Sequence, residues 1–223
     1  MKQSARHSIP AIPRGRFDNT LLALSPAPLS PHTLDALYAH YEELRRWSGQ
    51  LNLIGPGTAQ EVLERHFGES LAALPLLPEG PADLLDVGSG AGFPGLVLAA
   101  ARPDLAVTLV EARERRWAFL QSAARRAALP CRCLNARVRL PLPAGLPESI
   151  GVVTLRALRL EPEVLAALAA RFGPEGRVLL WAGGEEPPLP PGLVPGREVR
   201  LPGSARRRIL EFRPAAAAAH RTP

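Results

Sequence analysis

One glycine-rich segment constrains the fold of this chain more than any other part of the sequence. Residues 86–95 read DVGSGAGFPG, and they overlap the end of the short apolar run 84–87. An apolar run that ends in closely spaced glycines is typical of a buried strand that turns at once into a helix. The segment also contains Gly-x-Gly-x-x-Gly, a pattern found in dinucleotide-binding proteins but weak when it stands alone. The ligand therefore has to be argued from the surrounding sequence.

The rest of the chain predicts strands that alternate with helices. Strands are expected at 84–87, 106–111, 131–134, 151–154 and 177–181, helices at 115–128 and 163–171, and a closing hairpin at 197–201 and 207–212. This order predicts an α/β fold with a mostly parallel sheet and a terminal antiparallel hairpin, and such sheets bind ligands at the carboxyl ends of their strands. Apolar residues at helical spacing predict two earlier helices, at 33–47 and 58–74, and Thr58 with Glu61 forms a capping box at the start of the second.

Four parts are expected along the chain. Prolines at 10, 13, 26 and 28 predict a flexible arm over residues 1–30. A small helical region covers 31–78, the α/β domain covers 79–213, and an alanine-rich, disordered tail covers 214–223.

Composition excludes some classes of protein. Apolar residues make up 46% of the 223 residues, enough to bury a core, and no run approaches the ~18 apolar residues of a membrane-spanning helix. The N-terminus lacks the apolar stretch of a secretory signal, so we expect a cytoplasmic protein. Cys131 and Cys133 are too few for a disulfide framework or a four-ligand zinc site, and we expect both on an interior strand. The net charge of +6 is weak evidence for nucleic acid, because all basic residues but Lys2 are arginine, as a GC-rich genome would encode.

Two acidic residues near the glycine segment restrict the class of ligand that it could bind. Glycines alternate at 88, 90 and 92, with Asp86 two positions before the first, and this arrangement resembles the first motif of class I S-adenosylmethionine-dependent methyltransferases. Asp86 is then expected to address the cationic end of the cofactor. Glu111 ends the second strand, where a carboxylate can accept hydrogen bonds from ribose hydroxyls. Phe93 is expected either to stack against the cofactor or to fill the core.

Further segments narrow the resemblance to one family. Residues 52–54 (NLI), 64–71 (ERHFGESL) and 84–95 (LLDVGSGAGFPG) resemble the RsmG (GidB) family of bacterial small-subunit ribosomal RNA guanine-N7 methyltransferases. Residues 118–120 and 152–157 continue the resemblance in the same order, so that it covers about residues 35–213. It implies S-adenosylmethionine as cofactor, and 16S ribosomal RNA or the small ribosomal subunit as partner. We expect a monomer that does not bind membranes.

The resemblance also implies which residues form the site. Together with the glycine segment it predicts a cofactor site made by Asp86, Gly88, Gly90, Phe93, Glu111, Ala112, Arg113, Val138, Arg139 and Arg156. Arg156 is expected at the junction of cofactor and substrate, where it positions both. Candidate RNA-binding residues are Arg65, His66, Arg115, Arg116, Arg206 and Arg207. Guanine N7 carries a lone pair that needs no deprotonation, so no general base and no metal are expected.

The chain departs from the family pattern at three positions. Arg139 stands where the family usually has an acidic residue, Ala182-Gly183 stands where it usually has Lys-Gly, and Glu69 replaces an aspartate. These departures leave two alternatives open: a class I methyltransferase with a small molecule or protein as acceptor, and a non-catalytic relative that binds RNA or the ribosome. A dehydrogenase is disfavoured, because no polar catalytic residue stands out at a later strand end.

Overall fold

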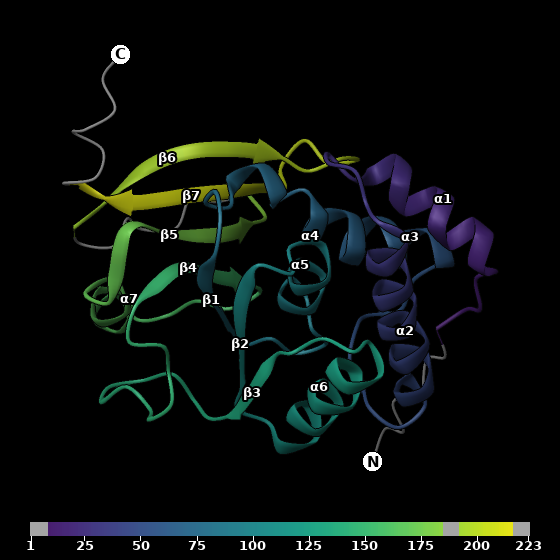
Figure 1. Cartoon of the computed structure of the whole chain (residues 1–223), viewed down its shortest axis with the longest axis horizontal. Helices are drawn as coiled ribbons and strands as arrows, with labels where there is room; N and C mark the ends of the chain where they lie inside the picture. Colours follow the sequence, from purple (N-terminus) through teal and green to yellow (C-terminus); the bar gives the residue numbers. More distant parts are fainter. Residues whose placement is uncertain (1–8, 185–191, 216–223) are drawn as a thin grey trace.

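A seven-stranded sheet forms the centre of the computed structural model, which describes residues 9–184 and 192–215 (Figure 1). The sheet order is β3-β2-β1-β4-β5-β7-β6. Its strands are β1 (Ala82–Val87), β2 (Leu105–Glu111), β3 (Arg132–Asn135), β4 (Ile150–Arg156), β5 (Phe172–Ala182), β6 (Leu193–Arg200) and β7 (Arg208–Pro214). Strands β1 to β5 run parallel, and β7 is antiparallel to both of its neighbours. The predicted α/β sheet with a terminal antiparallel hairpin is confirmed.

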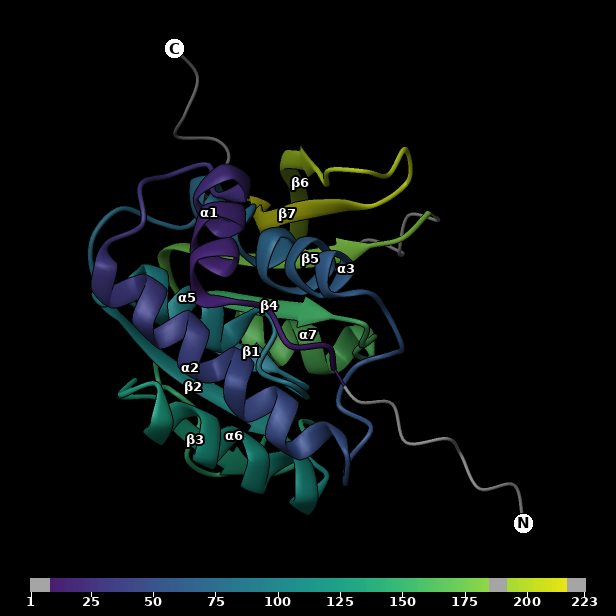
Figure 2. The same ribbon diagram turned by 90° about the vertical axis from the view of Figure 1, so that its right-hand side faces the viewer.

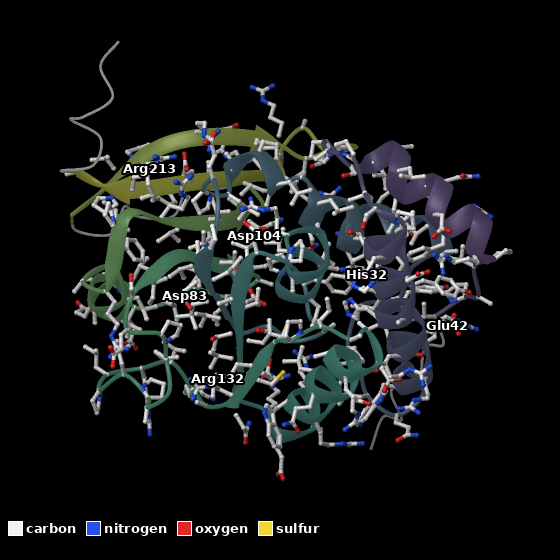
Figure 3. The ribbon with its side chains drawn as sticks, viewed as in Figure 1. His32, Glu42, Asp83, Asp104, Arg132 and Arg213 are labelled. Carbon is white, nitrogen blue, oxygen red and sulfur yellow. The ribbon has the colours of Figure 1, made fainter. Side chains whose placement is uncertain are left out.

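Apolar side chains cover both faces of the sheet, because successive residues of a strand point to opposite sides. Leu84 and Val152 lie in one buried cluster, with the N-terminal helices, α5 (Gly95–Ala101) and α6 (Glu114–Arg126). Leu85 and Val153 lie in a second cluster, with α7 (Pro162–Ala169). Figure 3 shows side chains in the spaces between the sheet and the helices beside it. The buried length of the strands is therefore mostly apolar, with a few buried polar side chains such as Asp86 and Thr154 among them.

The N-terminal helices pack directly on the first of these faces. They are α1 (Arg14–Leu24), α2 (Pro31–Ser48), α3 (Ala59–Val62), η1 (Leu63–Gly68), α4 (Glu69–Leu71) and the short turn η2 (Leu74–Leu76). In Figure 2 they face the viewer, with the strands behind them. The 58–74 segment is helical as expected, but its middle, η1, has wider turns and α4 ends at Leu71. The capping box is confirmed: Glu61 N–H donates to Thr58 Oγ1 (3.2 Å), and Thr58 N–H donates to Glu61 Oε2 (2.7 Å).

The prediction of a flexible arm over 1–30 is wrong for residues 9–30. Here α1 lies in the core, with Phe17 and Leu21 fully buried. The ring of Phe17 contacts those of Tyr38 (centroids 5.1 Å apart) and Phe67 (5.5 Å). The prolines bound this helix rather than prevent it, because Pro13 stands immediately before it and the others lie outside it. Residues 1–8, and 216–223 of the expected tail, lie outside the described part of the chain.

The two cysteines lie at an edge of the sheet rather than in its interior. Strand β3 is one of the two edge strands; Cys133 lies on it, Cys131 directly precedes it, and both are half-buried and unpaired. Burial raises the pKa of Cys131 to about 12 and that of Cys133 to about 11, so both are protonated thiols at neutral pH. No helix in residues 9–184 and 192–215 is long and apolar enough to cross a bilayer.

Candidate functional site

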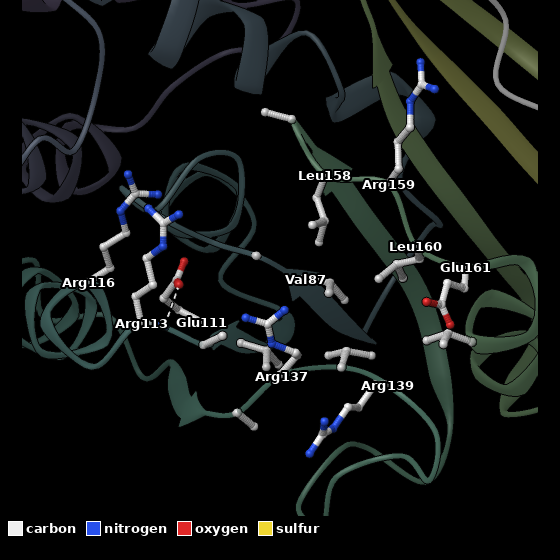
Figure 4. A pocket seen from close by; sticks show the side chains of 17 residues that line it. Val87, Glu111, Arg113, Arg116, Arg137, Arg139, Leu158, Arg159, Leu160 and Glu161 are labelled. Carbon is white, nitrogen blue, oxygen red and sulfur yellow. Dashed lines mark hydrogen bonds between the residues drawn. The ribbon is translucent and has the colours of Figure 1, made fainter.

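A pocket of about 600 Å³ opens at the carboxyl ends of the parallel strands (Figure 4). Its walls are the end of β1 with Gly88, the end of β2 with the start of α6, the loop 136–139 after β3, and the loop 157–161 after β4. Between β1 and β4 the chain order in the sheet reverses, and α/β sheets bind ligands at such a point. The size is in the range of small-molecule sites.

Six of the ten predicted cofactor residues line this pocket. They are Gly88, Glu111, Ala112, Arg113, Val138 and Arg139. The other four, namely Asp86, Gly90, Phe93 and Arg156, are outside its lining.

The glycine loop presents bare backbone to the pocket at Gly88. The N–H groups of Gly88 and Ser89 both donate to the carbonyl of Val110 (2.8 and 3.1 Å), which ties the loop to β2. Gly88 has φ +74°, a left-handed conformation that favours glycine. A Cβ at this position would lie 2.9 Å from Cδ2 of Leu158. The positive φ therefore favours glycine here, and a larger side chain would also displace the end of the Leu158 side chain.

Glu111 braces this loop and still has acceptor capacity. Its side chain is buried; Oε2 accepts the N–H of Gly90 (3.0 Å), and Oε1 accepts the N–H of Arg113 (2.8 Å). A carboxylate has about four lone-pair sites, so each oxygen of this pocket-lining residue can accept one further hydrogen bond. The position suits the pair of hydroxyls of a ribose.

Asp86 lies beneath the loop and does not reach the pocket. The residue is 1% exposed, and Oδ1 accepts the hydroxyl of Thr154 (2.6 Å). Its other oxygen, Oδ2, faces Gly95 at the start of α5 and forms no well-aligned hydrogen bond. Burial raises the pKa of Asp86 to about 6, and the Thr154 hydroxyl only partly opposes this. The expectation that Asp86 meets the cationic end of the cofactor is thus not what the geometry favours.

This raised pKa predicts a pH-dependent cost in stability. The folded state binds the Asp86 proton more tightly than the unfolded chain, so the free energy of unfolding falls as pH rises from about 4 to about 6. We expect Asp86→Asn to be more stable than the wild type at pH 7, with a difference that shrinks towards pH 4. Urea unfolding at both pH values measures it, and a constant difference across that range would contradict the assignment.

Phe93 packs among aromatic side chains of the N-terminal helices. Its ring centroid is 4.9 Å from that of His40, 5.1 Å from that of His66 and 5.0 Å from that of Phe67. It is 7% exposed. Of the two roles left open for this residue, filling the core is the one that these contacts support.

His40 is a supporting residue that the sequence did not indicate. Its Nε2 lies 2.8 Å from the carbonyl oxygen of Ala91 in the glycine loop. Burial lowers the pKa of His40 to about 4, so the ring is neutral at pH 7 and donates from Nε2. His40 lies on the apolar face of α2 between Leu37 and Tyr41, and nothing in that spacing distinguishes a loop contact from ordinary core packing.

Arg156 joins the end of β4 to the N-terminal helices instead of lining the pocket. Its Nη2 forms an ion pair with Glu69 Oε2 (2.8 Å) and also donates to the carbonyl of Arg65. Glu69 pairs with Arg207 as well, and its carbonyl accepts the indole N–H of Trp181 (3.0 Å). Burial lowers the pKa of Arg156, although the neighbouring acids oppose this. Glu69 thus links α4 to β4, to β5 and to the turn before β7.

The predicted RNA-binding residues fall into two groups. Arg115 and Arg116 donate to the carbonyls of Gln50 (3.3 Å) and Asn52 (3.0 Å), which ties α6 to the loop before α3. Arg207 pairs with Glu69, and the ring of His66 packs on Phe93. In residues 9–184 and 192–215, the side chains of Arg65 and Arg206 form no hydrogen bond or ion pair and are exposed. Only these two remain free for a partner.

Comparison with known proteins agrees with this geometry. Residues 33–186, more than half of the chain, match the GidB family model, described as rRNA small subunit methyltransferase G. The chain is 54% identical over 92 residues to the "Ribosomal RNA small subunit methyltransferase G" of Desulfotalea psychrophila. This match covers 41% of this chain and 42% of that protein. It is 41% identical over 157 residues to the protein of that name from Rhodospirillum centenum, which covers 70% of this chain and 69% of that one.

A solved structure shares the fold at low sequence identity. The structure of a SAM-dependent methyltransferase from Aquifex aeolicus matches with a TM-score of 0.52 at 16% identity, covering 68% of this chain and 92% of that one. The sheet order, the pocket beside the glycine loop and the family match point the same way. The chain therefore belongs to the rRNA small subunit methyltransferase G family and has the class I SAM-dependent methyltransferase fold.

Proposed function

We propose that this chain transfers the methyl group of S-adenosylmethionine to N7 of a guanine in 16S ribosomal RNA, acting as a cytoplasmic monomer on the small ribosomal subunit. The observation that carries the proposal is the pocket formed by Gly88, Glu111 and Val138 in a chain that belongs to this family. The alternatives of another acceptor or a non-catalytic binder rest only on the departures at Arg139 and Ala182.

The residues of the pocket fit this cofactor. The available acceptor sites of Glu111 suit the ribose hydroxyls, and the bare backbone at Gly88 leaves room for the amino-acid part. Val138 and Ala112 supply an apolar wall for the adenine ring. Arg139 cannot accept a hydrogen bond from the adenine amino group through its side chain, because a guanidinium only donates.

The chemistry asks little of the protein beyond placement. When bound, S-adenosylmethionine would supply an activated methyl group, whose bond to sulfur would break as the in-plane lone pair of guanine N7 bonded to its carbon, releasing S-adenosylhomocysteine. Holding two reactants in line can lower the barrier by ~7–11 kcal/mol. The rigid floor of the pocket, tied together by Val110, Glu111 and the glycine loop, serves this role. No side chain has to remove a proton.

Radiolabelled methyl transfer tests the proposal. Small subunits from a strain that lacks this protein should accept label at guanine N7, and subunits from the wild-type strain should accept none, because their site is already methylated. Isothermal calorimetry would report cofactor binding in parallel. Cofactor binding without labelled RNA would contradict the RNA substrate and favour another acceptor. Failure of both would favour the non-catalytic binder.

A further inference from the structure

The cofactor pocket carries more positive charge than its proposed cofactor requires. Five arginines line it, but only two glutamates. One of the five, Arg116, donates to the carbonyl of Asn52. The other four, which we call the rim arginines, are Arg113, Arg137, Arg139 and Arg159. All four are exposed, and within the described part of the chain their guanidinium groups form no hydrogen bond or ion pair.

The acids of the pocket do not neutralise this charge. Glu111 accepts the backbone N–H groups of Gly90 and Arg113, and Glu161 is exposed without an ion pair to a rim arginine, so two carboxylates stand against five guanidinium groups and leave a surplus of three positive charges. S-adenosylmethionine itself has a sulfonium and an ammonium group against one carboxylate, so it is a net cation. Binding of such a ligand does not call for a surplus of guanidinium groups, whereas a polyanion is attracted by it.

The rim arginines come from three separate segments around the pocket. Arg113 precedes α6, Arg137 and Arg139 lie in the loop after β3, and Arg159 lies in the loop after β4. Figure 4 shows Arg113 beside Arg116 on one side of the pocket and Arg159 on the other, with Leu158 pointing inward between them. A chain of phosphates that crosses the opening therefore meets a guanidinium on each side.

Three of the five arginines that the sequence nominated for RNA are less suited to this task, and the two free ones, Arg65 and Arg206, lie outside the lining of the pocket. Arg115 and Arg116 hold backbone carbonyls, and Arg207 is paired with Glu69. Releasing any of them for a phosphate would break a contact within the fold. The rim arginines have no such contact to lose, and guanidinium groups suit phosphate by geometry as well as charge.

We propose that the rim arginines hold the phosphate backbone of a single-stranded RNA segment whose target guanine enters the same pocket as the cofactor. This inference rests on the proposed function. A single strand is the partner because the deep groove of an A-form duplex hides the N7 edge, whereas an unpaired base can turn into a pocket while its phosphates stay at the rim. The backbone then crosses directly over the opening.

The salt dependence of RNA binding tests this placement. The probe is a fluorescein-labelled single-stranded oligoribonucleotide that contains guanine, titrated at several KCl concentrations. The logarithm of the binding constant falls with the logarithm of the salt concentration, and each lost phosphate contact makes this slope less steep by ~0.7 for a single strand. Arg137→Gln and Arg159→Gln should each make the slope less steep by that amount. Arg16→Gln is the matched control, because Arg16 is exposed and unpaired on α1, outside this pocket.

Three results would overturn the placement. Both rim variants could keep the wild-type slope, or Arg16→Gln could change the slope as much as the rim variants do. The rim variants could also change the slope as much on a matched duplex as on the single strand. The labelling assay keeps this test separate from the proposed function. If the rim variants had less steep slopes but the wild type transferred no methyl group, the phosphate contacts would be supported and the proposed reaction would be contradicted. If the wild type transferred methyl groups but the rim variants kept the wild-type slope, the reaction would be supported and the phosphate contacts of the rim arginines would be contradicted.

Discussion

Replacing Gly88 by aspartate is expected to weaken cofactor binding by on the order of 100-fold, or roughly 3 kcal/mol, because the new side chain occupies space in the pocket. The backbone there has φ +74°, and the new Cβ would lie 2.9 Å from Leu158 Cδ2. The carboxylate would extend further into the space between β1 and the loop after β4. Calorimetry with S-adenosylmethionine measures the loss, and methyl transfer should fall with it.

A matched control separates binding from folding. Gly15→Asp introduces the same side chain at the start of α1, where a Cβ meets nothing within 4 Å and φ is not positive. This variant should bind the cofactor as the wild type does. Circular dichroism should show both variants folded. If Gly88→Asp bound the cofactor within a few-fold of wild type, the pocket beside the loop would not be the cofactor site.

The glycines of this loop serve different purposes, and sequence alone does not separate them. A Cβ at Gly95 would lie 2.3 Å from Leu109 Cδ2 and 2.6 Å from Asp86 Oδ2, so this glycine allows α5 to pack on the sheet. Gly90 donates its N–H to Glu111 inside the loop. Only Gly88 both adopts a positive φ and lines the pocket.

The elements of the sheet were predictable because their signals are local. Apolar runs such as 84–87 and the amphipathic spacing of α6 are properties of a few neighbouring residues. The position of α1 was not predictable in this way. Its place in the core depends on rings 21 to 50 residues away, on Tyr38 and Phe67, and the prolines on either side of it resemble those of a linker.

Some residues of the site could likewise be predicted from the sequence around them, whereas the contacts of others depend on residues far away in the chain. Gly88 and Glu111 were predicted from strand ends and do line the pocket. Asp86 and Arg156 also stand at strand ends, but strand alternation places Asp86 on the face of Leu84 and Arg156 on the face of Val152, towards the N-terminal helices. Counting residues in steps of two along β1 and β4 would have indicated this direction. The partner of Arg156, Glu69, would have remained unknown, because it lies 87 positions earlier.

Removing the Glu211 carboxylate is expected to lower the free energy of unfolding by about 3–5 kcal/mol, because Arg177 loses its buried ion-pair partner and keeps only the exposed carboxylate of Glu175 (3.1 Å). Glu211 is 1% exposed and accepts hydrogen bonds from Arg177 Nη1 (3.1 Å), Arg213 Nη2 (2.8 Å) and the N–H of Arg197 (2.9 Å). Arg177 is 2% exposed. Arg213 extends from β7, where Figure 3 labels it. Urea unfolding of Glu211→Ala at pH 7 measures the loss.

The acid response of the wild type gives a second measure of the same cluster. Burial alone would raise the pKa of Glu211, but the hydrogen bonds from Arg213 and Arg197 outweigh it, and the pKa is lowered. Its stabilisation is therefore complete above the ordinary glutamate pKa and is lost as pH falls through the lowered folded-state value. Glu198→Ala is the control, since Glu198 is 40% exposed and lies 3.9 Å from both Arg200 and Arg208, where exposed pairs contribute ~0–1 kcal/mol. Equal losses in the two variants, or no difference in their acid response, would show that the buried cluster at the far end of the sheet from the pocket stabilises the fold no more than a surface pair does.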